Sequence, residues 1–124
     1  MADVVPTILL FENDAQMVYL LRRYAQVSGY HLIAVDTIVN ILPIVQDTQP
    51  HVIVISFACF SNSAIDMLPA LRSNAHVQVI PIIVLCDMLD DYGVWQHDAD
   101  AWLVKPVLVS DFTDVLATVG IAFC

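Results

Sequence analysis

The sequence predicts an α/β protein in which a parallel sheet of five strands is covered by helices on both faces. Five short apolar runs carry this prediction, and most of them are rich in β-branched residues. The runs do not alternate strictly between apolar and polar residues, which is typical of strands buried on both faces. Segments of about 12–20 residues separate them, long enough for one helix each, so the pattern indicates repeated strand–helix units. The five runs are Ile8–Phe11, His31–Val35, Val52–Ile55, Ile80–Cys86 and Trp102–Val104.

The segment after the first run has the clearest helical pattern. Asp14 precedes this segment, and its carboxylate can accept a hydrogen bond from a free backbone N–H group of the first turn. Ser28-Gly29 follows it, and glycine readily adopts the left-handed conformation that ends a helix. The apolar residues that recur at helical spacing in between are Met17, Leu20, Leu21 and Tyr24.

Prolines make the two middle helices less regular. Pro43 lies within Ile38–Val45, and Pro69 lies within Ala64–Leu71. A proline inside a helix removes a backbone hydrogen bond and clashes with the preceding turn. We therefore expect a late start or a kink in the second helix, and a kink in the third.

The last helix should begin near Ser110-Asp111 and end at Gly120. Its apolar residues recur with helical spacing and predict one buried face. They are Phe112, Val115, Leu116 and Val119.

Length and charge bound the domain organisation and the possible partners. The 124 residues are a common size for one compact domain, so we expect a single domain over residues 1–124, with an ordered core over about residues 7–120. The net charge is −9, with four basic and thirteen acidic residues. This balance argues strongly against a nucleic-acid surface, which needs clustered lysine and arginine, and it disfavours binding to anionic membranes.

Hydropathy suggests a cytoplasmic protein with a partner interface. The N-terminus lacks the positive region of a signal peptide, and no run approaches the 18 or so apolar residues of a membrane span. Apolar residues nevertheless make up 59% of the sequence, above the roughly 45–50% of ordinary domains. We expect part of this apolar surface to lie in a contact with another protein.

Four motifs at the ends of the runs resemble those of response-regulator receiver domains of two-component signalling. They are Ile8–Asp14, Pro50–Ser56, Ile80–Cys86 and Trp102–Pro106, in the order and spacing of that family. The resemblance covers nearly the whole chain. It implies a flavodoxin-like (βα)5 three-layer sandwich with the strand order 2-1-3-4-5.

The resemblance also implies a role for each residue of the predicted pocket. In receivers two acidic residues after the first strand hold Mg²⁺; these positions are Glu12 and Asn13 here. The aspartate that accepts the phosphoryl group corresponds to Ser56. The small hydroxyl residue that follows the phosphoryl group corresponds to Cys86, and the lysine that pairs with it corresponds to Lys105.

The substitutions remove the chemistry of phosphoryl transfer from this pocket. Three carboxylates and one ammonium give a typical receiver site two surplus negative charges, whereas Glu12 and Lys105 sum to zero, and Asp14 is better explained as a helix cap. Mg²⁺ prefers hard anionic oxygens, and two of its usual carboxylates are replaced here by neutral groups, so we expect no bound cofactor and no enzymatic activity. Phosphorylation of an aspartate at this position is excluded by the identity of Ser56.

Two readings of the retained lysine remain open. In the first reading, Lys105 forms a standing ion pair with Glu12, or a hydrogen bond with Ser56, and so locks one conformation. In the second, Lys105 merely satisfies a buried carboxylate and switches nothing. The resemblance also implies a cis bond between Lys105 and Pro106, because proline makes the cis form accessible.

The predicted interaction face lies around the fifth strand. Receivers commonly dimerise through their fourth helix, fifth strand and fifth helix. The stretch from Cys86 to Lys105 is about one helical turn shorter than usual, so we expect a short or distorted fourth helix. The candidate switch or interface residues are Trp95, Trp102 and Phe112. A homodimer through this face is one expectation; a histidine kinase, an effector domain or another regulator is the other.

The sequence thus favours a phosphorylation-independent receiver that acts as a protein-interaction module, either alone or as a piece of a longer protein. A small-molecule or redox sensor that uses the degenerate pocket and Cys86 is the alternative. An enzyme is the weakest reading, since no Gly-x-Ser-x-Gly elbow surrounds Ser56 and no glycine-rich phosphate loop exists. His97-Asp98-x-Asp100 has no matching metal ligands elsewhere and indicates a solvated loop.

Overall fold

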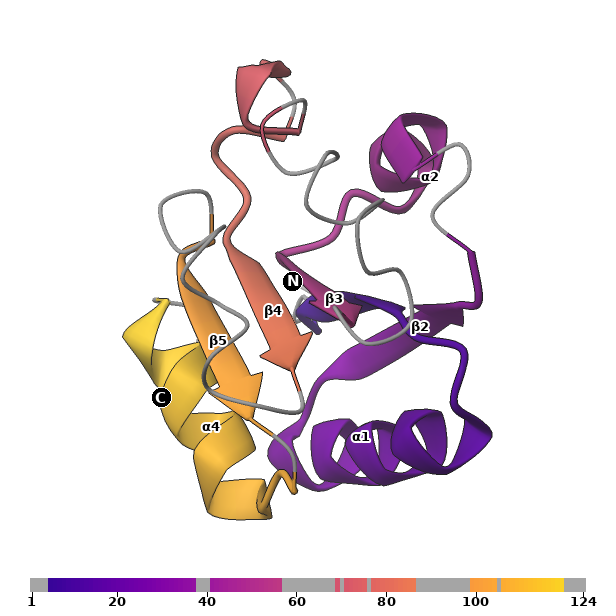
Figure 1. Cartoon of the computed structure of the whole chain (residues 1–124), viewed down its shortest axis with the longest axis vertical. Coiled ribbons are helices and arrows are strands. Elements are labelled where there is room, and N and C mark those ends of the chain that lie inside the picture. Colours follow the sequence, from indigo (N-terminus) through magenta and orange to yellow (C-terminus); the bar gives the residue numbers. More distant parts are fainter. Residues whose placement is uncertain are drawn as a thin grey trace.

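The computed structural model confirms the predicted sheet. It describes residues 5–37, 41–56, 69, 71–75, 77–86, 99–104 and 106–119. Five parallel strands form one sheet in the order β2-β1-β3-β4-β5 (Figure 1). The strands are β1 Thr7–Phe11, β2 His31–Val35, β3 Val52–Ser56, β4 Ile82–Cys86 and β5 Ala101–Val104.

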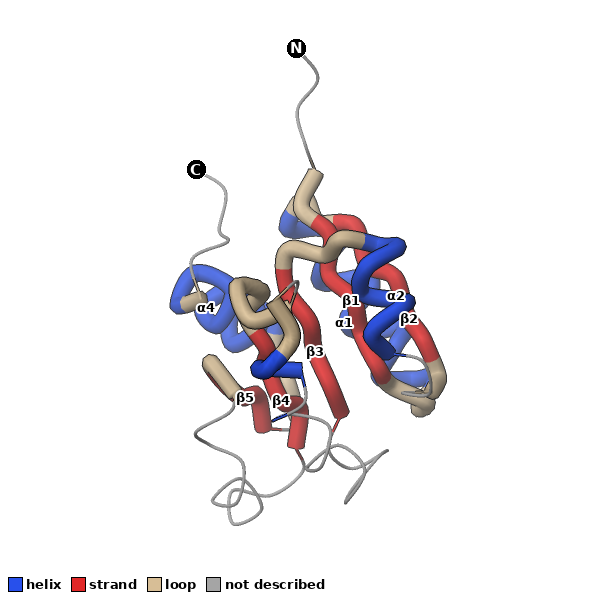
Figure 2. The backbone as a smooth tube through the Cα atoms, turned by 90° about the horizontal axis from the view of Figure 1, so that it is seen from above, coloured by secondary structure: helices blue, strands red, loops and turns tan. Residues whose placement is uncertain are grey.

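The helices cover both faces of this sheet. Helices α1 (Ala15–Ser28) and α4 (Val109–Thr118) lie on one face, and α2 (Ile41–Thr48) lies on the other (Figures 1 and 2). Two separate apolar clusters result, one under each helical layer. Alternate residues of each strand feed the two clusters: Leu10 packs toward α1 and α4, and Leu9 packs toward α2.

Helix α1 begins and ends where the sequence predicts. The Asp14 carboxylate accepts a hydrogen bond from the Gln16 N–H at 2.9 Å, which satisfies one of the free donors of the first turn. At the other end Gly29 adopts a φ of 84°, and its N–H donates to carbonyls of the last turn. A side chain at this φ would be strained, so glycine ends the helix.

Two predicted boundaries differ from the structure, the start of α4 by one residue and the start of β4 by two. Helix α2 is described over Ile41–Thr48 and contains Pro43, and residues 38–40 before it lie outside the described part of the chain. The expected late start or kink of this helix therefore stays a prediction. Helix α4 begins at Val109, slightly before the prediction, because the Asp111 carboxylate accepts a hydrogen bond from the Leu108 N–H at 3.0 Å.

Strand β4 begins at Ile82, two residues later than the apolar run suggested. Pro81 lies just before it and has no N–H to give to a neighbouring strand. Strand β4 is therefore shorter than the hydropathy of the sequence indicates.

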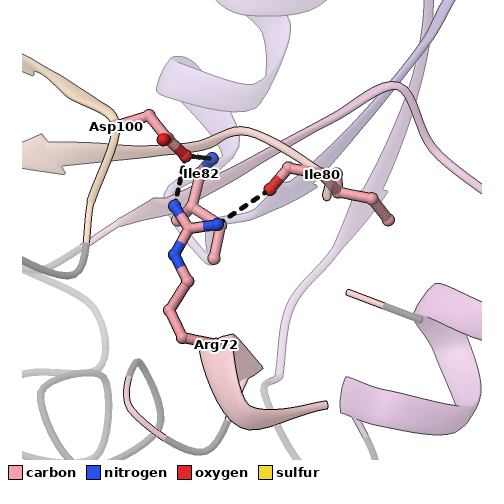
Figure 3. Close-up of polar contacts among 4 residues, drawn as sticks. All are labelled: Arg72, Ile80, Ile82 and Asp100. Atoms are coloured by element: carbon pink, nitrogen blue, oxygen red, sulfur yellow. Dashed lines mark hydrogen bonds and ion pairs between the residues drawn. The ribbon is translucent and has the colours of Figure 1, made fainter. Parts of the chain in front are cut away.

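A polar cluster fixes the amino ends of β4 and β5 (Figure 3). The Asp100 carboxylate accepts hydrogen bonds from the Ile82 N–H, at 2.7 Å, and from the Arg72 guanidinium. Arg72 also donates to the Ile80 carbonyl at 3.2 Å, and the Asp100 N–H donates to the Ile82 carbonyl at 2.8 Å. These contacts join three segments at the end of the sheet that lies opposite the predicted pocket.

Several predictions fall outside the described residues. They concern a kink at Pro69 within the third helix, the shape of the fourth helix and the role of Gly120. Among the helices that the structure describes, none is long and apolar enough to cross a membrane.

Candidate functional site

The register of the sheet brings the predicted pocket residues to one edge. Phe11 on β1 pairs with Ile55 on β3, so Glu12 and Ser56 are the next residues along two neighbouring strands. Cys86 ends β4 and pairs with Val104 on β5. All of these positions lie at the carboxyl ends of parallel strands, where open α/β sheets bind ligands.

Glu12 is buried, and its carboxylate faces its own loop. Only 1% of its surface is exposed, and Oε2 accepts a hydrogen bond from the Asp14 N–H at 3.1 Å. The Glu12 N–H donates to the Val35 carbonyl at 3.0 Å, which ties the end of β1 to the end of β2. The retained acid of the pocket is therefore held by backbone groups on both sides.

Ser56 is fully buried at the end of β3. Its exposed fraction is 0%, and its Oγ has no hydrogen-bond partner among the residues that the structure describes. In the described part of the chain, Glu12 and Ser56 are the two buried residues that are polar or charged. They are also the two neighbours that the strand register places side by side.

The rest of the acidic loop points elsewhere. Asn13 and Asp14 are exposed, and Asp14 caps α1, as the sequence predicts. A wide groove of about 660 Å³ lies next to Asn13, between α1 and the end of β2. Tyr19, Arg22 and Asp36 line its rim; the sequence analysis missed it, although residues three apart on α1 share one face.

Cys86 is buried and packs away from the helices α1 and α4. It belongs to the apolar cluster on the α2 face, and its Sγ donates a hydrogen bond to the Leu103 carbonyl at 3.5 Å. Reactive thiols are partly exposed and have electropositive surroundings. The burial of Cys86 therefore does not favour the redox alternative.

The remaining predicted residues divide into three groups. Lys105 and Trp95 lie outside the described residues, so the pairing of Lys105 stays a prediction. Trp102 is half-buried on β5. Phe112, which the sequence grouped with the interface, is only 1% exposed and packs its ring against Tyr24 at a centroid distance of 5.9 Å, so its side chain belongs to the core.

The described residues at this edge offer few of the ligands that Mg²⁺ prefers. Mg²⁺ requires a near-octahedral set of hard oxygen ligands and is usually held by carboxylates. Glu12 supplies one carboxylate, whereas Asn13 and Ser56 are neutral. Within the described ranges, no three His, Cys, Asp or Glu side chains gather closely enough to hold a metal ion.

We next compared the chain with known proteins. No protein-family model matches the chain. The transcriptional regulatory protein KdpE of Mycobacterium tuberculosis, in two strains, is 26% identical over 105 residues, which make up 85% of this chain and 46% of KdpE. The chain thus spans about half the length of the curated relatives it matches.

Solved structures agree more closely in shape than in sequence. The chemotaxis response regulator CheY4 of Vibrio cholerae aligns with a TM-score of 0.83 at 18% identity, over 94% of this chain and 99% of that one. The receiver domain of the sensor histidine kinase PA1611 from Pseudomonas aeruginosa PAO1 gives 0.81 at 16%, over the same shares, and holds a magnesium ion in its active-site cleft. The chain therefore has the fold of response-regulator receiver domains, a CheY-like and flavodoxin-like sandwich.

Proposed function

We propose that this chain is a receiver domain of two-component signalling that works without phosphorylation, by binding another protein. The observation that carries the proposal is Ser56. It is fully buried at the end of β3, beside the retained acid Glu12, in the position that the resemblance assigns to the phosphoacceptor.

The chemistry of the hydroxyl supports this proposal. A carboxylate can attack a phosphoryl donor directly and form an acyl phosphate, whereas a serine hydroxyl needs a base to become a nucleophile. No described residue accepts a hydrogen bond from the Ser56 hydroxyl, so none is placed to take its proton. Burial at 0% also keeps a bulky phosphoryl donor from the oxygen.

The residues that could coordinate a metal ion also support the proposal. Metal ions position the phosphoryl group and neutralise its charge in phosphoryl transfer. With one carboxylate from Glu12 and neutral groups at Asn13 and Ser56, we propose that Mg²⁺ binding is lost. The PA1611 receiver, which holds magnesium in its cleft, is the natural reference protein for a side-by-side measurement.

A module that does not react must act by contact, so the proposal includes a protein partner and no enzymatic activity. We propose a cytoplasmic location, since the partners of such domains are kinases, effector domains or other regulators of that compartment. The face around β5 and α4 is the proposed contact surface. The homodimer predicted through this face and a complex with a different protein are both forms of this proposal.

The experiment is a titration of Trp102 fluorescence with Mg²⁺, and then with beryllofluoride, in a Trp95→Phe background. The sequence has two tryptophans, so this substitution leaves Trp102 as the single reporter. We expect no saturable change up to millimolar metal, and no phosphoprotein after incubation with acetyl phosphate. Saturable quenching by millimolar Mg²⁺, or a stable phosphoryl adduct on the chain, would contradict the proposal.

A further inference from the structure

A histidine side chain takes part in the hydrogen bonding at the amino end of β1. Strand β1 lies between β2 and β3 (Figure 1). On the β3 side, the Thr7 N–H donates to the ring nitrogen Nδ1 of His51 at 3.0 Å, and the His51 N–H donates to the Thr7 carbonyl at 2.8 Å. On the β2 side, the His31 N–H donates to the Pro6 carbonyl at 2.9 Å. One of these three hydrogen bonds therefore uses a titratable side chain.

The local backbone explains why a ring nitrogen is the acceptor here. The paired residues of β1 and β3 begin at Ile8 and Val52, so Thr7 lies just outside the regular ladder on this side. Gln49, directly after α2, has a φ of 46°, so the chain enters β3 from a turn and not in an extended conformation. A backbone N–H needs an acceptor wherever the chain places it. The imidazole of His51 therefore takes the place that a main-chain carbonyl has in a regular parallel ladder.

This hydrogen bond requires the neutral imidazole. A backbone N–H can only donate, so Nδ1 of His51 must present a lone pair, and the proton of the neutral ring must lie on Nε2. An imidazolium carries a proton on both nitrogens, so protonation sets two N–H groups against each other and breaks the bond. His51 is exposed, so water can deliver the proton. Histidine side chains take up this proton at about pH 6.5, within the physiological range.

The neighbouring titratable groups do not replace the lost contact. His31 lies across β1, where the register places it opposite Thr7. Asp47 lies in the last turn of α2, and Asp100 lies at the amino end of the more distant strand β5, where it is already used in an ion pair. No acidic side chain in the described part of the chain forms an ion pair with His51. The carbonyl end of α2 attracts an imidazolium, which eases protonation of His51 without restoring the hydrogen bond.

We propose that the Thr7–His51 hydrogen bond is a pH-sensitive contact, which holds the amino end of β1 while His51 is neutral and releases it when His51 is protonated. In the unfolded chain the imidazole binds a proton without giving up this contact, whereas in the folded chain it must give the contact up. Acid therefore favours the unfolded chain, and the stability that the contact contributes falls as the pH falls from about 8 to about 5. The inference does not depend on the proposed function, because both residues lie at the end of the sheet opposite the predicted pocket.

The first test follows the unsubstituted chain by NMR from about pH 8 to about pH 5. Long-range proton–nitrogen spectra report which ring nitrogen of His51 carries the proton, and the amide signal of Thr7 reports its hydrogen bond. At the alkaline end we expect the proton on Nε2 and none on Nδ1. On acidification we expect the Thr7 amide proton to move upfield with the same midpoint as the His51 ring. A proton on Nδ1 at the alkaline end, or a Thr7 signal that does not follow the ring, overturns the proposal.

The second test compares two substitutions of His51 by thermal unfolding, followed by circular dichroism. Asparagine places Oδ1 where His51 has Nδ1 and does not titrate, whereas alanine removes the acceptor. At about pH 8 the unsubstituted chain should match His51→Asn and unfold about 2–4 °C above His51→Ala. At about pH 5 it should match His51→Ala. A constant difference between the unsubstituted chain and His51→Asn over the whole pH range would overturn the proposal, since His51 would then be only a structural acceptor.

His31→Asn is the matched control. His31 is exposed, and its ring has no hydrogen bond or ion pair with any residue that the structure describes, although its N–H bonds to the same end of β1. We expect the pH profile of His31→Asn to stay within about 1 °C of that of the unsubstituted chain. Equal effects of His31→Asn and His51→Asn would show that the chain responds only to its net charge of −9, which refutes the contact. These measurements use no metal or phosphodonor, so their failure leaves the proposed function standing, and phosphorylation of the chain would not bear on the contact.

Discussion

Replacing Ser56 by alanine should stabilise the protein. The hydroxyl is fully buried and has no hydrogen-bond partner among the described residues, so folding removes it from water without compensation. Such an uncompensated polar group costs about 1–3 kcal/mol. Alanine keeps the Cβ and omits only the oxygen.

The expected gain is smaller than the full desolvation cost. Omitting the oxygen leaves a small void whose neighbours lose some packing contacts, and this cancels part of the benefit. We expect Ser56→Ala to raise the free energy of unfolding by about 1 kcal/mol. For a chain of this length the midpoint of thermal unfolding should rise by about 3–5 °C.

Urea denaturation followed by circular dichroism provides the assay, and Ser73→Ala provides the matched control. The Ser73 hydroxyl is exposed and donates to the Pro69 carbonyl at 2.9 Å, so its removal should change stability by less than about 0.5 kcal/mol. A loss of about 1 kcal/mol or more in Ser56→Ala would refute the reasoning. It would mean that the hydroxyl is hydrogen-bonded in solution and that the pocket satisfies its polar groups.

Three further predictions follow from the same contacts. Asp100→Ala should lower the free energy of unfolding by about 2 kcal/mol in urea denaturation, because it removes the acceptor of the Ile82 N–H. Asp100→Asn keeps an acceptor oxygen and should lower it by about half as much. Equal losses in the two variants would contradict this prediction. Asp14→Ala should cost about 1 kcal/mol in the same assay through loss of the α1 cap; an unchanged midpoint would show that the cap contributes nothing. The double substitution Asn13→Asp with Ser56→Asp should create millimolar Mg²⁺ affinity, measured by calorimetry, since it restores the carboxylates that the ion needs. Absence of a heat of binding would show that the arrangement of the pocket, and not only the missing carboxylates, prevents Mg²⁺ from binding.

Most of the fold could be predicted from the sequence because hydropathy and local signals agree. Short apolar runs marked all five strands, and Asp14 with Gly29 marked both ends of α1. Hydropathy and helix-capping signals each depend on only a few neighbouring residues, so both can be read directly from the sequence. Errors arose at boundaries, where one local group decides: Pro81 delays β4, and the Asp111 carboxylate begins α4 one residue earlier than expected.

Side-chain direction could be predicted less well than position. Phe112 was placed both on the buried face of the last helix and among the candidate interface residues; its burial against Tyr24 confirms the first placement, because residues of a short helix divide between core and surface within one turn. Cys86 ends β4 at the edge where the pocket was predicted, but the sequence gives no sign that its thiol donates a hydrogen bond to the Leu103 carbonyl. The groove along α1 depends on how a helix and a strand end meet, and no run of residues signals that.

The neutral residues in the pocket also affect the stability of the fold. Three carboxylates close together repel one another, and the repulsion is relieved by a divalent cation or by protonation. Here Asn13 and Ser56 carry no charge, and the Oε2 of the buried Glu12 accepts a hydrogen bond from the Asp14 N–H. The folded state then needs no metal to offset repulsion at this edge, so the free energy of unfolding should be the same with millimolar Mg²⁺ and with EDTA. Under the proposed function, Ser56 both removes the phosphoacceptor and lowers the repulsion, and selection for a stable, non-reacting scaffold would favour both effects together.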